Sequence, residues 1–322
     1  MTIRIILATD DRFAMACGVT MHSVLTTTRS RIRFALFQSG VSTENLRRLR
    51  QIAACHSGCE LEVIDADAVL RSLPMPARSE SYSRMIYARL VAPDLLSESR
   101  ALYLDTDTLV LENVANLFHA ELQGLPLGAI RDYGAECRCF RDPNERAYFH
   151  GILDGRPYGD YFNTGVLVMD LDAFRRERLG QRAIEYIQQR PDLDFPDQDA
   201  LNATLDGAVN FLPERWNTMV MERRVAVDPF VPKITRQRVK AAFQNPAILH
   251  YAGAKPWTPS PVHRRRNFFN ALRQTPWRNF QISTSGLDWK EKRKLLKLWR
   301  GELVRVQLQL MGRPIVHWGR AA

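Results

Sequence analysis

Two aspartates spaced two residues apart are the first residues in the sequence that could perform chemistry. Asp105 and Asp107 stand in "ALYLDTDTLVLEN" (101–113), whose leucines and β-branched residues favour a β-strand. Residues i and i+2 of a strand point to the same face, so both carboxylates are expected to project together. Two neighbouring, partly buried anions repel each other unless a cation or a proton lies between them. The pattern indicates either a divalent-metal site at a strand end or simply two solvated aspartates.

The elements that must position these carboxylates alternate along the first two-thirds of the chain. Apolar β-like runs cover 3–9, 32–37, 60–65, 101–107 and 125–130, and helical patterns cover 14–28, 42–56 and 81–96. This alternation predicts an α/β fold in which a mostly parallel sheet is flanked by helices. Ligands of such sheets bind at the carboxyl ends of the strands. Asp10, at the end of the first run, and the Asp105–Asp107 pair are expected to meet there.

The glycine-rich phosphate-binding motifs are absent from the sequence. No G-x-G-x-x-G follows the first strand-like run and no G-x-x-x-x-G-K-[ST] occurs. The usual dinucleotide-binding and P-loop interpretations are thereby excluded. A bound phosphate would need a metal ion or basic side chains to neutralise it.

The cysteines and the apolar runs indicate the compartment. An odd number of cysteines without a secretion signal argues against a disulfide framework, and reduced thiols are expected. A zinc site is the alternative, although "CHSGC" and "CRC" lack the usual spacing. No apolar run approaches the roughly 20 residues that cross a bilayer, and "MTIRIILATDD" reads as a strand rather than a signal peptide. The sequence predicts a cytoplasmic protein. The cysteines are Cys17, Cys55, Cys59, Cys137 and Cys139.

The net charge of +10 is concentrated near the end of the 322-residue chain. Residues 264–322 contain 14 Lys and Arg against three acidic residues, a net charge of +11, whereas residues 1–263 carry a net charge of −1. This asymmetry predicts a catalytic body over 1–262 and a basic tail over 263–322 with its own anionic partner.

Within the tail, residues 288–310 are expected to form a basic amphipathic helix. Its apolar face comprises Leu295, Trp299, Leu303, Val306 and Leu310. Such a helix is typical of an anchor on an anionic membrane surface. Nucleic-acid binding and simple packing on the body are the alternatives; the membrane is favoured, and no nucleic acid is expected as a partner.

Four blocks of the sequence together resemble glycosyltransferase family 8. They are "YLDTDTLV", "YFNTGVLVMDL", "PDQDALN" and "ILHYAGAKPW", in the family's order, and the resemblance covers about residues 3–258. It implies the Rossmann-like glycosyltransferase A fold, a nucleotide-sugar donor and retention of anomeric configuration. The chain looks similar to bacterial galactosyl- and glucosyltransferases that build lipopolysaccharide and lipooligosaccharide cores.

The resemblance also implies a metal site and a donor site. Asp105, Asp107 and His250 would bind Mn²⁺ (or Mg²⁺) against the diphosphate, and mixed carboxylate and imidazole ligands suit Mn²⁺. On its own, His250 would instead be interpreted as a core histidine, and Arg89 as an exposed helix charge. The donor-binding set implied by the family comprises Ala8, Thr9, Asp10, Arg89, Thr106, Gly253 and Lys255, together with the three metal ligands.

Four further residues are implied to lie near the transferred sugar: Asp132, Asn163, Asp197 and Gln198. Asp197 has a second interpretation as a helix N-cap. Gln198 matches the residue on the far face of the anomeric carbon, where a strong nucleophile would be Asp or Glu. The amide favours a front-face mechanism in which the leaving phosphate helps to deprotonate the acceptor.

The sequence thus predicts a metal-dependent retaining hexosyltransferase. It would move galactose or glucose from a UDP-sugar to a saccharide acceptor, on lipopolysaccharide or another lipid-linked glycan, at the inner face of the cytoplasmic membrane. Two other classes remain open on the residues alone. One is a metal-dependent nucleotidyltransferase, and the other is a non-catalytic basic protein that binds anionic membrane or nucleic acid.

Overall fold

A computed structural model describes residues 2–75, 82–283, 288–290, 306–310 and 313–317 of the chain. Its centre is a seven-stranded sheet with the order β3-β2-β1-β4-β7-β6-β8. The strands are β1 (Thr2–Asp10), β2 (Arg31–Ser39), β3 (Cys59–Asp65), β4 (Arg100–Leu104), β6 (Leu127–Arg131), β7 (Phe162–Asp170) and β8 (Val209–Phe211). All neighbouring pairs are parallel except those that involve β7, which runs antiparallel to both β4 and β6. The expected α/β fold with a mostly parallel sheet is confirmed.

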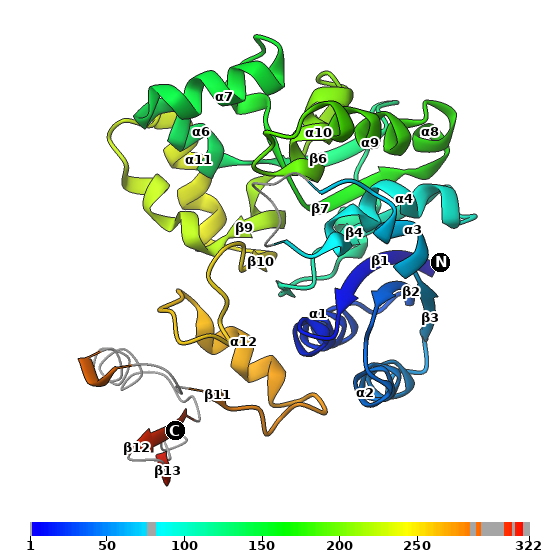
Figure 1. The fold of residues 1–322 in the computed structure, drawn as a ribbon, viewed down its shortest axis with the longest axis vertical. Coiled ribbons are helices and arrows are strands. Elements are labelled where there is room, and N and C mark those ends of the chain that lie inside the picture. The colour runs from blue at the N-terminus through cyan, green and yellow to red at the C-terminus, as the bar shows by residue number, and fades with distance from the viewer. Residues whose placement is uncertain (1, 76–81, 284–287, 291–305, 311–312, 318–322) are drawn as a thin grey trace.

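Helices cover both faces of this sheet (Figure 1). One layer contains α1 (Ala14–Thr27), α2 (Thr43–Ala54) and α12 (Arg265–Leu272); the other contains α4 (Ala88–Leu95), α8 (Leu171–Arg176), α9 (Leu179–Gln189) and α10 (Pro196–Thr204). Because side chains alternate along a strand, Ile5 and Leu7 of β1 pack in the first layer and Ile6 packs in the second. The sheet therefore separates two hydrophobic cores.

A second, three-stranded sheet lies beside the carboxyl ends of the central strands. It has the order β5-β10-β9 and consists of β5 (Thr108–Val110), β10 (Ile248–His250) and β9 (Thr218–Met219). The antiparallel register of β5 and β10 places His250 opposite Thr108. Residues separated by about 140 positions in the chain are thereby brought to one place.

The expectation that 101–107 form one strand was wrong at its end. β4 stops at Leu104, and Asp105 to Asp107 form a turn between β4 and β5. The backbone N–H of Thr108 donates to the carbonyl of Asp105, and so does the Thr108 hydroxyl, at 2.8 Å. Local bonds of this kind compete with the strand ladder. The carboxylates therefore converge through a turn and not through strand periodicity.

The hydrophobic core continues beyond residue 262. Phe268, Phe269 and Leu272 of α12, together with Trp277, are buried in the core that also contains α1. A Cβ on Gly18 would lie 2.4 Å from the Trp277 ring, so α1 can approach this ring only with glycine at that position. The packed body thus extends at least to Ile282, and any tail that acts separately from it must begin later.

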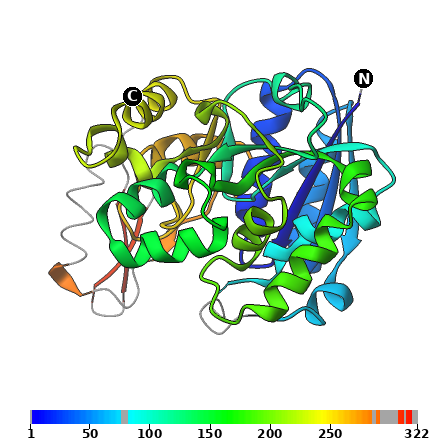
Figure 2. The ribbon, with the colours of Figure 1, turned by 90° about the horizontal axis from the view of Figure 1, so that it is seen from above.

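The helix expected over 288–310 falls largely on residues 291–305, which lie outside the described residues. Its last five residues form a strand instead, so that part of the expectation was wrong. β12 (Val306–Leu310) pairs antiparallel with β13 (Arg313–His317) and parallel with β11 (Ile282–Ser283). The strict alternation of "VQLQL" matches the two-residue period of a strand. This hairpin and the β3 edge of the central sheet lie on opposite sides of the molecule (Figure 1, Figure 2).

All five cysteines are free, and the group of side chains able to hold a metal among the described residues contains no cysteine. No helix in the described part of the chain is both long and apolar enough to cross a membrane.

Candidate active site

A cavity of about 530 Å³ opens at the carboxyl ends of β1 and β4. Every residue that the sequence singled out as a site residue lines it. These are Ala8, Thr9, Asp10, Arg89, Asp105, Thr106, Asp107, Asp132, Asn163, Asp197, Gln198, His250, Gly253 and Lys255. The fold thus gathers side chains from the ends of β1, β4 and β6, from α4, β7 and α10, and from β10 and the loop after it into one site.

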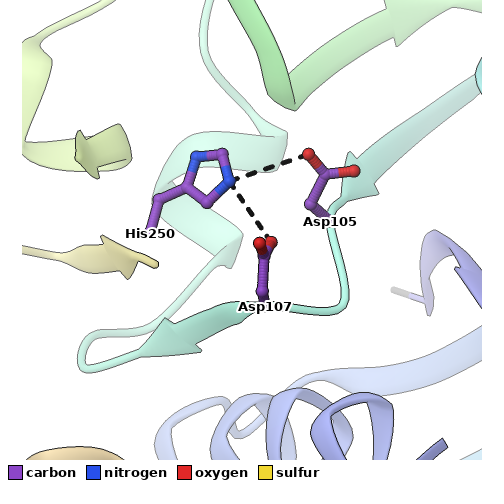
Figure 3. A group of neighbouring side chains, drawn as sticks. All are labelled: Asp105, Asp107 and His250. Atoms are coloured by element: carbon purple, nitrogen blue, oxygen red, sulfur yellow. Dashed lines mark ion pairs between the residues drawn. The ribbon is translucent and has the colours of Figure 1, made fainter. Parts of the chain in front are cut away.

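Three of these side chains form a cluster suited to a metal ion (Figure 3). Asp105, Asp107 and His250 each offer one ligand atom, and these atoms lie within 4.8 Å of one another. His250 Nε2 is 3.2 Å from an Asp107 oxygen and 3.7 Å from an Asp105 oxygen. Two carboxylates and one imidazole are a donor set for a divalent first-row metal. The residues present therefore fit the divalent ion that the sequence predicts.

A glycine makes the close approach of these ligands feasible. Gly165 of β7 faces the cluster, and a Cβ at this position would lie 2.3 Å from His250 Cε1 and 2.7 Å from an Asp105 oxygen. The Gly165 carbonyl also accepts a hydrogen bond from the Asp105 N–H at 2.8 Å. Only glycine fits here without displacing two of the three ligands.

The orientation of His250 is set by a residue that the sequence did not reveal. His250 Nδ1 lies 2.8 Å from the side-chain oxygen of Asn217, which is completely buried. Because this oxygen can only accept, Nδ1 carries the proton and the Nε2 lone pair faces the aspartates. Asn217 ends the 3-10 segment Glu214–Asn217 next to β9. No motif marks it, and only the pairing of β9 with β10 places it beside the histidine.

A chain of amides continues from Asn217 towards the predicted sugar-binding end. Asn217 Nδ2 donates to Asn163 Oδ1 at 2.8 Å, and Asn163 Nδ2 donates to Gln198 Oε1 at 3.0 Å. Gln198 Nε2 then donates to Asp132 at 3.1 Å. Asp132 in turn accepts from the Ala135 N–H at the start of α6 (Tyr133–Arg141). A continuous chain of hydrogen bonds thus connects His250 of the cluster with the residues predicted to lie near the sugar.

Arg89 is buried among carboxylates. Its side chain reaches Asp105 at 2.8 Å and Asp197 at 3.2 Å and lies over the Tyr103 ring, 4.3 Å from the centroid. The interpretation of Arg89 as an exposed helix charge was therefore wrong. Burial disfavours its charged form, but Asp105, Tyr103 and Asp197 more than compensate, so the pKa of Arg89 lies above its ordinary value.

Lys255 neutralises the second aspartate of the cluster. Its ammonium pairs with Asp107 and donates to the Tyr251 carbonyl at 3.0 Å. Burial alone would raise the pKa of Asp107, yet Lys255 and His250 together hold that pKa well below its ordinary value. The Asp107 carboxylate is therefore ionised at any physiological pH.

The N-cap interpretation of Asp197 was also wrong. α10 starts at Pro196 with Phe195 at its N-cap, so Asp197 lies inside the first turn. Its carboxylate pairs with Arg89 and accepts from the Thr164 hydroxyl at 3.1 Å. Burial raises the pKa of Asp197, against the opposing charge of Arg89.

Sequence reasoning also missed Asp199 of the "DQD" stretch. It is fully buried, accepts from Tyr148 and Tyr161 at 2.6 and 2.5 Å, and accepts from the Phe195 N–H at 2.9 Å. Burial raises its pKa to about 7 in spite of these three donors. Asp199 is not among the residues that line the cavity, and its bond to the N–H of the N-cap residue Phe195 fixes the start of α10.

Other cavity-lining side chains also carry no motif. Asp10 is paired with Arg12 at 3.0 Å, and Arg138 pairs with Glu145 at 3.1 Å. The remaining lining residues are Arg12, Phe13, Tyr82, Ser83, Met85, Ile86, Tyr103, Arg138, Thr164, Phe195, Met219, Met221, Glu222 and Ala252.

A Rossmann-like sheet with an Asp-x-Asp turn and a distant histidine at its carboxyl edge defines a glycosyltransferase of the A fold. Comparison with known families gives the particular class. The chain belongs to glycosyltransferase family 8, because the family model "Glycosyl transferase family 8" matches residues 4–260.

Curated relatives of the chain are bacterial proteins. "General stress protein A" of Bacillus subtilis (strain 168) is 27% identical over 285 residues, which are 85% of this chain and 94% of that protein. "Lipopolysaccharide 1,2-glucosyltransferase" of Escherichia coli (strain K12) is 28% identical over 206 residues, 62% of this chain and 57% of that protein.

Solved structures share the fold. The galactosyltransferase LgtC, in complex with donor and acceptor sugar analogues, superposes with a TM-score of 0.68 at 26% identity, over 93% of this chain and 99% of that chain. The bifunctional glycosyltransferase WbbM gives a TM-score of 0.74 at 23% identity, over 86% of this chain and 50% of that chain, and this likeness shows the fold alone.

Proposed function

We propose that the protein is a retaining hexosyltransferase that moves galactose or glucose from a UDP-sugar to a saccharide acceptor. The acceptor is lipopolysaccharide or another lipid-linked glycan. One observation supports this most directly: the Asp105, Asp107 and His250 cluster lies in a cavity that the predicted donor-binding residues also line. The names of the E. coli glucosyltransferase and of LgtC agree with a hexose donor.

In this proposal Asp105, Asp107 and His250 hold Mn²⁺ (or Mg²⁺). When bound, the metal supplies a Lewis acid that stabilises negative charge on the departing diphosphate. Lys255 is the second cation of the cavity available to a phosphate oxygen, as a flexible point charge. Arg89 holds the Asp105 carboxylate in its orientation through an ion pair of 2.8 Å.

Gln198 and Asp132 serve the sugar end in this proposal. The Gln198 carbonyl already accepts from Asn163 and from the Thr164 N–H, and its amide nitrogen donates to Asp132. An amide held from both ends is a poor nucleophile but a rigid polar surface against one face of a sugar. This supports a front-face reaction, in which the leaving phosphate accepts the acceptor's proton. Buried polar groups of this kind discriminate sugar epimers, because a missing hydroxyl leaves one of them unpaired.

Family membership decides against the nucleotidyltransferase and the non-catalytic alternatives. For the location, we propose a peripheral protein at the inner face of the cytoplasmic membrane, held there by the basic residues that follow the packed body. Residues 283–322 contain nine Lys and Arg against three acidic residues, and this excess of positive charge supports the proposal.

The experiment that tests the proposed function measures UDP release from a panel of UDP-sugars with Mn²⁺. Water serves first as acceptor, followed by core oligosaccharides and other saccharides. We expect release from UDP-galactose or UDP-glucose that requires a divalent metal and rises with one acceptor. Activity that is unchanged in a chelator, or a nucleoside monophosphate as product, contradicts the proposal.

A further inference from the structure

Exposed apolar side chains are concentrated in one short stretch beside the cavity. Of the eight large hydrophobic residues that are exposed in the described part of the chain, four lie between positions 221 and 234. Their exposed fractions are 51% for Met221, 76% for Val227, 67% for Phe230 and 62% for Ile234. We call Val227, Phe230 and Ile234 the apolar patch. It spans the end of η5 (Val220–Val227), the turn after it and the first turn of α11 (Lys233–Gln244), seen in Figure 1.

The patch is displayed by a fixed backbone. Asp228, between Val227 and Phe230, is buried, pairs with Arg141 at 2.5 Å and accepts from the Phe230 N–H at 3.0 Å. Flanking this turn, Val225 and Val231 are buried in a small core with Tyr133 of α6. The segment therefore has an inner apolar side that is used for packing. The outer apolar side has no packing role in the described structure.

Basic residues are frequent in the stretch that carries the patch. Residues 221–240 contain six Lys and Arg but two acidic residues. Of the acidic pair, Asp228 is ion-paired with Arg141 and Glu222 lines the cavity. Arg223, Arg224, Lys233 and Lys240 are exposed, and the Arg141 guanidinium lies 5.5 Å from the centre of the Phe230 ring. The surface combines exposed apolar side chains with an excess of positive charge.

We propose that the apolar patch docks the body of the protein onto an anionic lipid surface. Apolar side chains at the centre and cations at the rim match acyl chains below and anionic headgroups above. Each basic residue close to such a surface contributes to attraction that salt screens. This site is distinct from the basic residues after Ile282, because it is part of the packed body.

The position of the patch in the chain suggests what docking on a membrane would do for the cavity. Met221 lines the cavity, is itself half exposed and precedes Val227 by six residues, so the stretch that carries the patch starts at the cavity. Docking through Val227 and Phe230 would hold the cavity entrance at the plane of the membrane, where a lipid-linked acceptor lies. That use rests on the proposed function, whereas the docking itself does not.

The test measures partition of the full-length protein into vesicles of phosphatidylcholine alone and of phosphatidylcholine with phosphatidylglycerol, without any sugar nucleotide. The variant Val227→Ser/Phe230→Ser/Ile234→Ser should lower partition into the anionic vesicles at least tenfold. The variant Arg223→Glu/Arg224→Glu/Lys233→Glu should lower it similarly and reduce its dependence on salt. Because all these side chains are exposed, both variants should keep the wild-type melting temperature and the UDP release measured with a water-soluble acceptor.

Matched controls carry the same changes elsewhere. Val69→Ser/Leu95→Ser removes exposed apolar groups, and Arg29→Glu/Arg50→Glu reverses exposed charges, far from the patch in sequence; both should partition within twofold of wild type. Phe230→Trp should retain binding and show a blue-shifted emission on anionic vesicles.

Partition of the serine variant within twofold of wild type overturns the proposal, as does an equal loss of partition in the controls. If the serine variant instead abolishes a dimer in sedimentation velocity while vesicle binding is unchanged, a second copy of the chain covers the patch and the lipid proposal is wrong.

Discussion

Replacing Asn217 by alanine should weaken metal binding although Asn217 is not a metal ligand. The substitution removes the oxygen that accepts the proton of His250 Nδ1 at 2.8 Å. Because His250 is buried, the imidazole must then leave an N–H unsatisfied or move the proton to Nε2, which faces the aspartates. An orphaned buried donor costs about 1–3 kcal/mol. Loss of a hydrogen-bond partner behind a metal ligand typically costs roughly 10–100-fold in affinity, or about 1.4–2.7 kcal/mol.

The assay is a calorimetric titration of Mn²⁺ in the presence of UDP, repeated by spin resonance of free Mn²⁺. Asn202→Ala is the matched control, because Asn202 is an equally buried asparagine that bonds Phe162 and Gln198 and not His250. The control should lower the melting temperature without changing metal affinity. The reasoning is refuted if Asn217→Ala binds Mn²⁺ within twofold of wild type, or if Asn202→Ala loses as much affinity.

Four further outcomes are expected. Asp105→Asn or Asp107→Asn should lower turnover at least about 10²-fold, since each removes a negative charge of the metal site. Circular dichroism should show that either variant keeps the fold. Full activity in either variant would contradict the metal site. Gln198→Ala should slow turnover yet leave calorimetric UDP affinity nearly unchanged, and an equal loss in both would place Gln198 in the nucleotide site. Burial raises the pKa of Asp199 from 3.8 to about 7, so its stabilising protonated form is fully present below about pH 4 and lost as pH rises through 7. This should lower the free energy of unfolding by up to roughly 4 kcal/mol between those limits; Asp199→Asn should flatten that part of the urea-denaturation profile, and an unchanged profile would contradict the assignment. Truncation after residue 262 should give an unfolded or aggregating protein, because it removes the core residues Phe268, Phe269 and Trp277. Truncation after residue 290 should keep UDP-sugar activity and weaken binding to anionic vesicles. A stable and active 1–262 fragment would contradict this expectation, because α12 would then be dispensable for the fold.

Local patterns were enough to predict the central sheet and its helices. The apolar run of 3–9 and the helical stripe of 42–56 are properties of consecutive residues, so β1 and α2 appear where they were expected. Ser42 even caps α2 through the Asn45 N–H. The site residues were predicted because four sequence blocks match those of glycosyltransferase family 8 in the same order.

Contacts between distant short segments could not be predicted in this way. β9 and β10 contain two and three residues, which is too few for any periodicity to be visible, and Asn217 reaches His250 only through their pairing. The charge of the basic stretch at 264–266 also gave no indication that part of this stretch is buried. Arg265 was counted as tail charge, yet it is buried and donates to the carbonyls of Thr258 and Ser260. A charge total does not distinguish a solvated arginine from one that holds a loop.

The ion pair between Lys255 and Asp107 makes the protein's own side chain a competitor for the cation site. A divalent ion that binds Asp107 must displace an ammonium that already neutralises the same carboxylate, and this exchange lowers the affinity for metal alone. A polyanionic ligand that draws Lys255 towards itself removes the competition. Metal and a diphosphate ligand should then bind with positive cooperativity, each raising the other's affinity by the same factor. The free protein, for its part, keeps its acidic cluster neutralised without any bound ion.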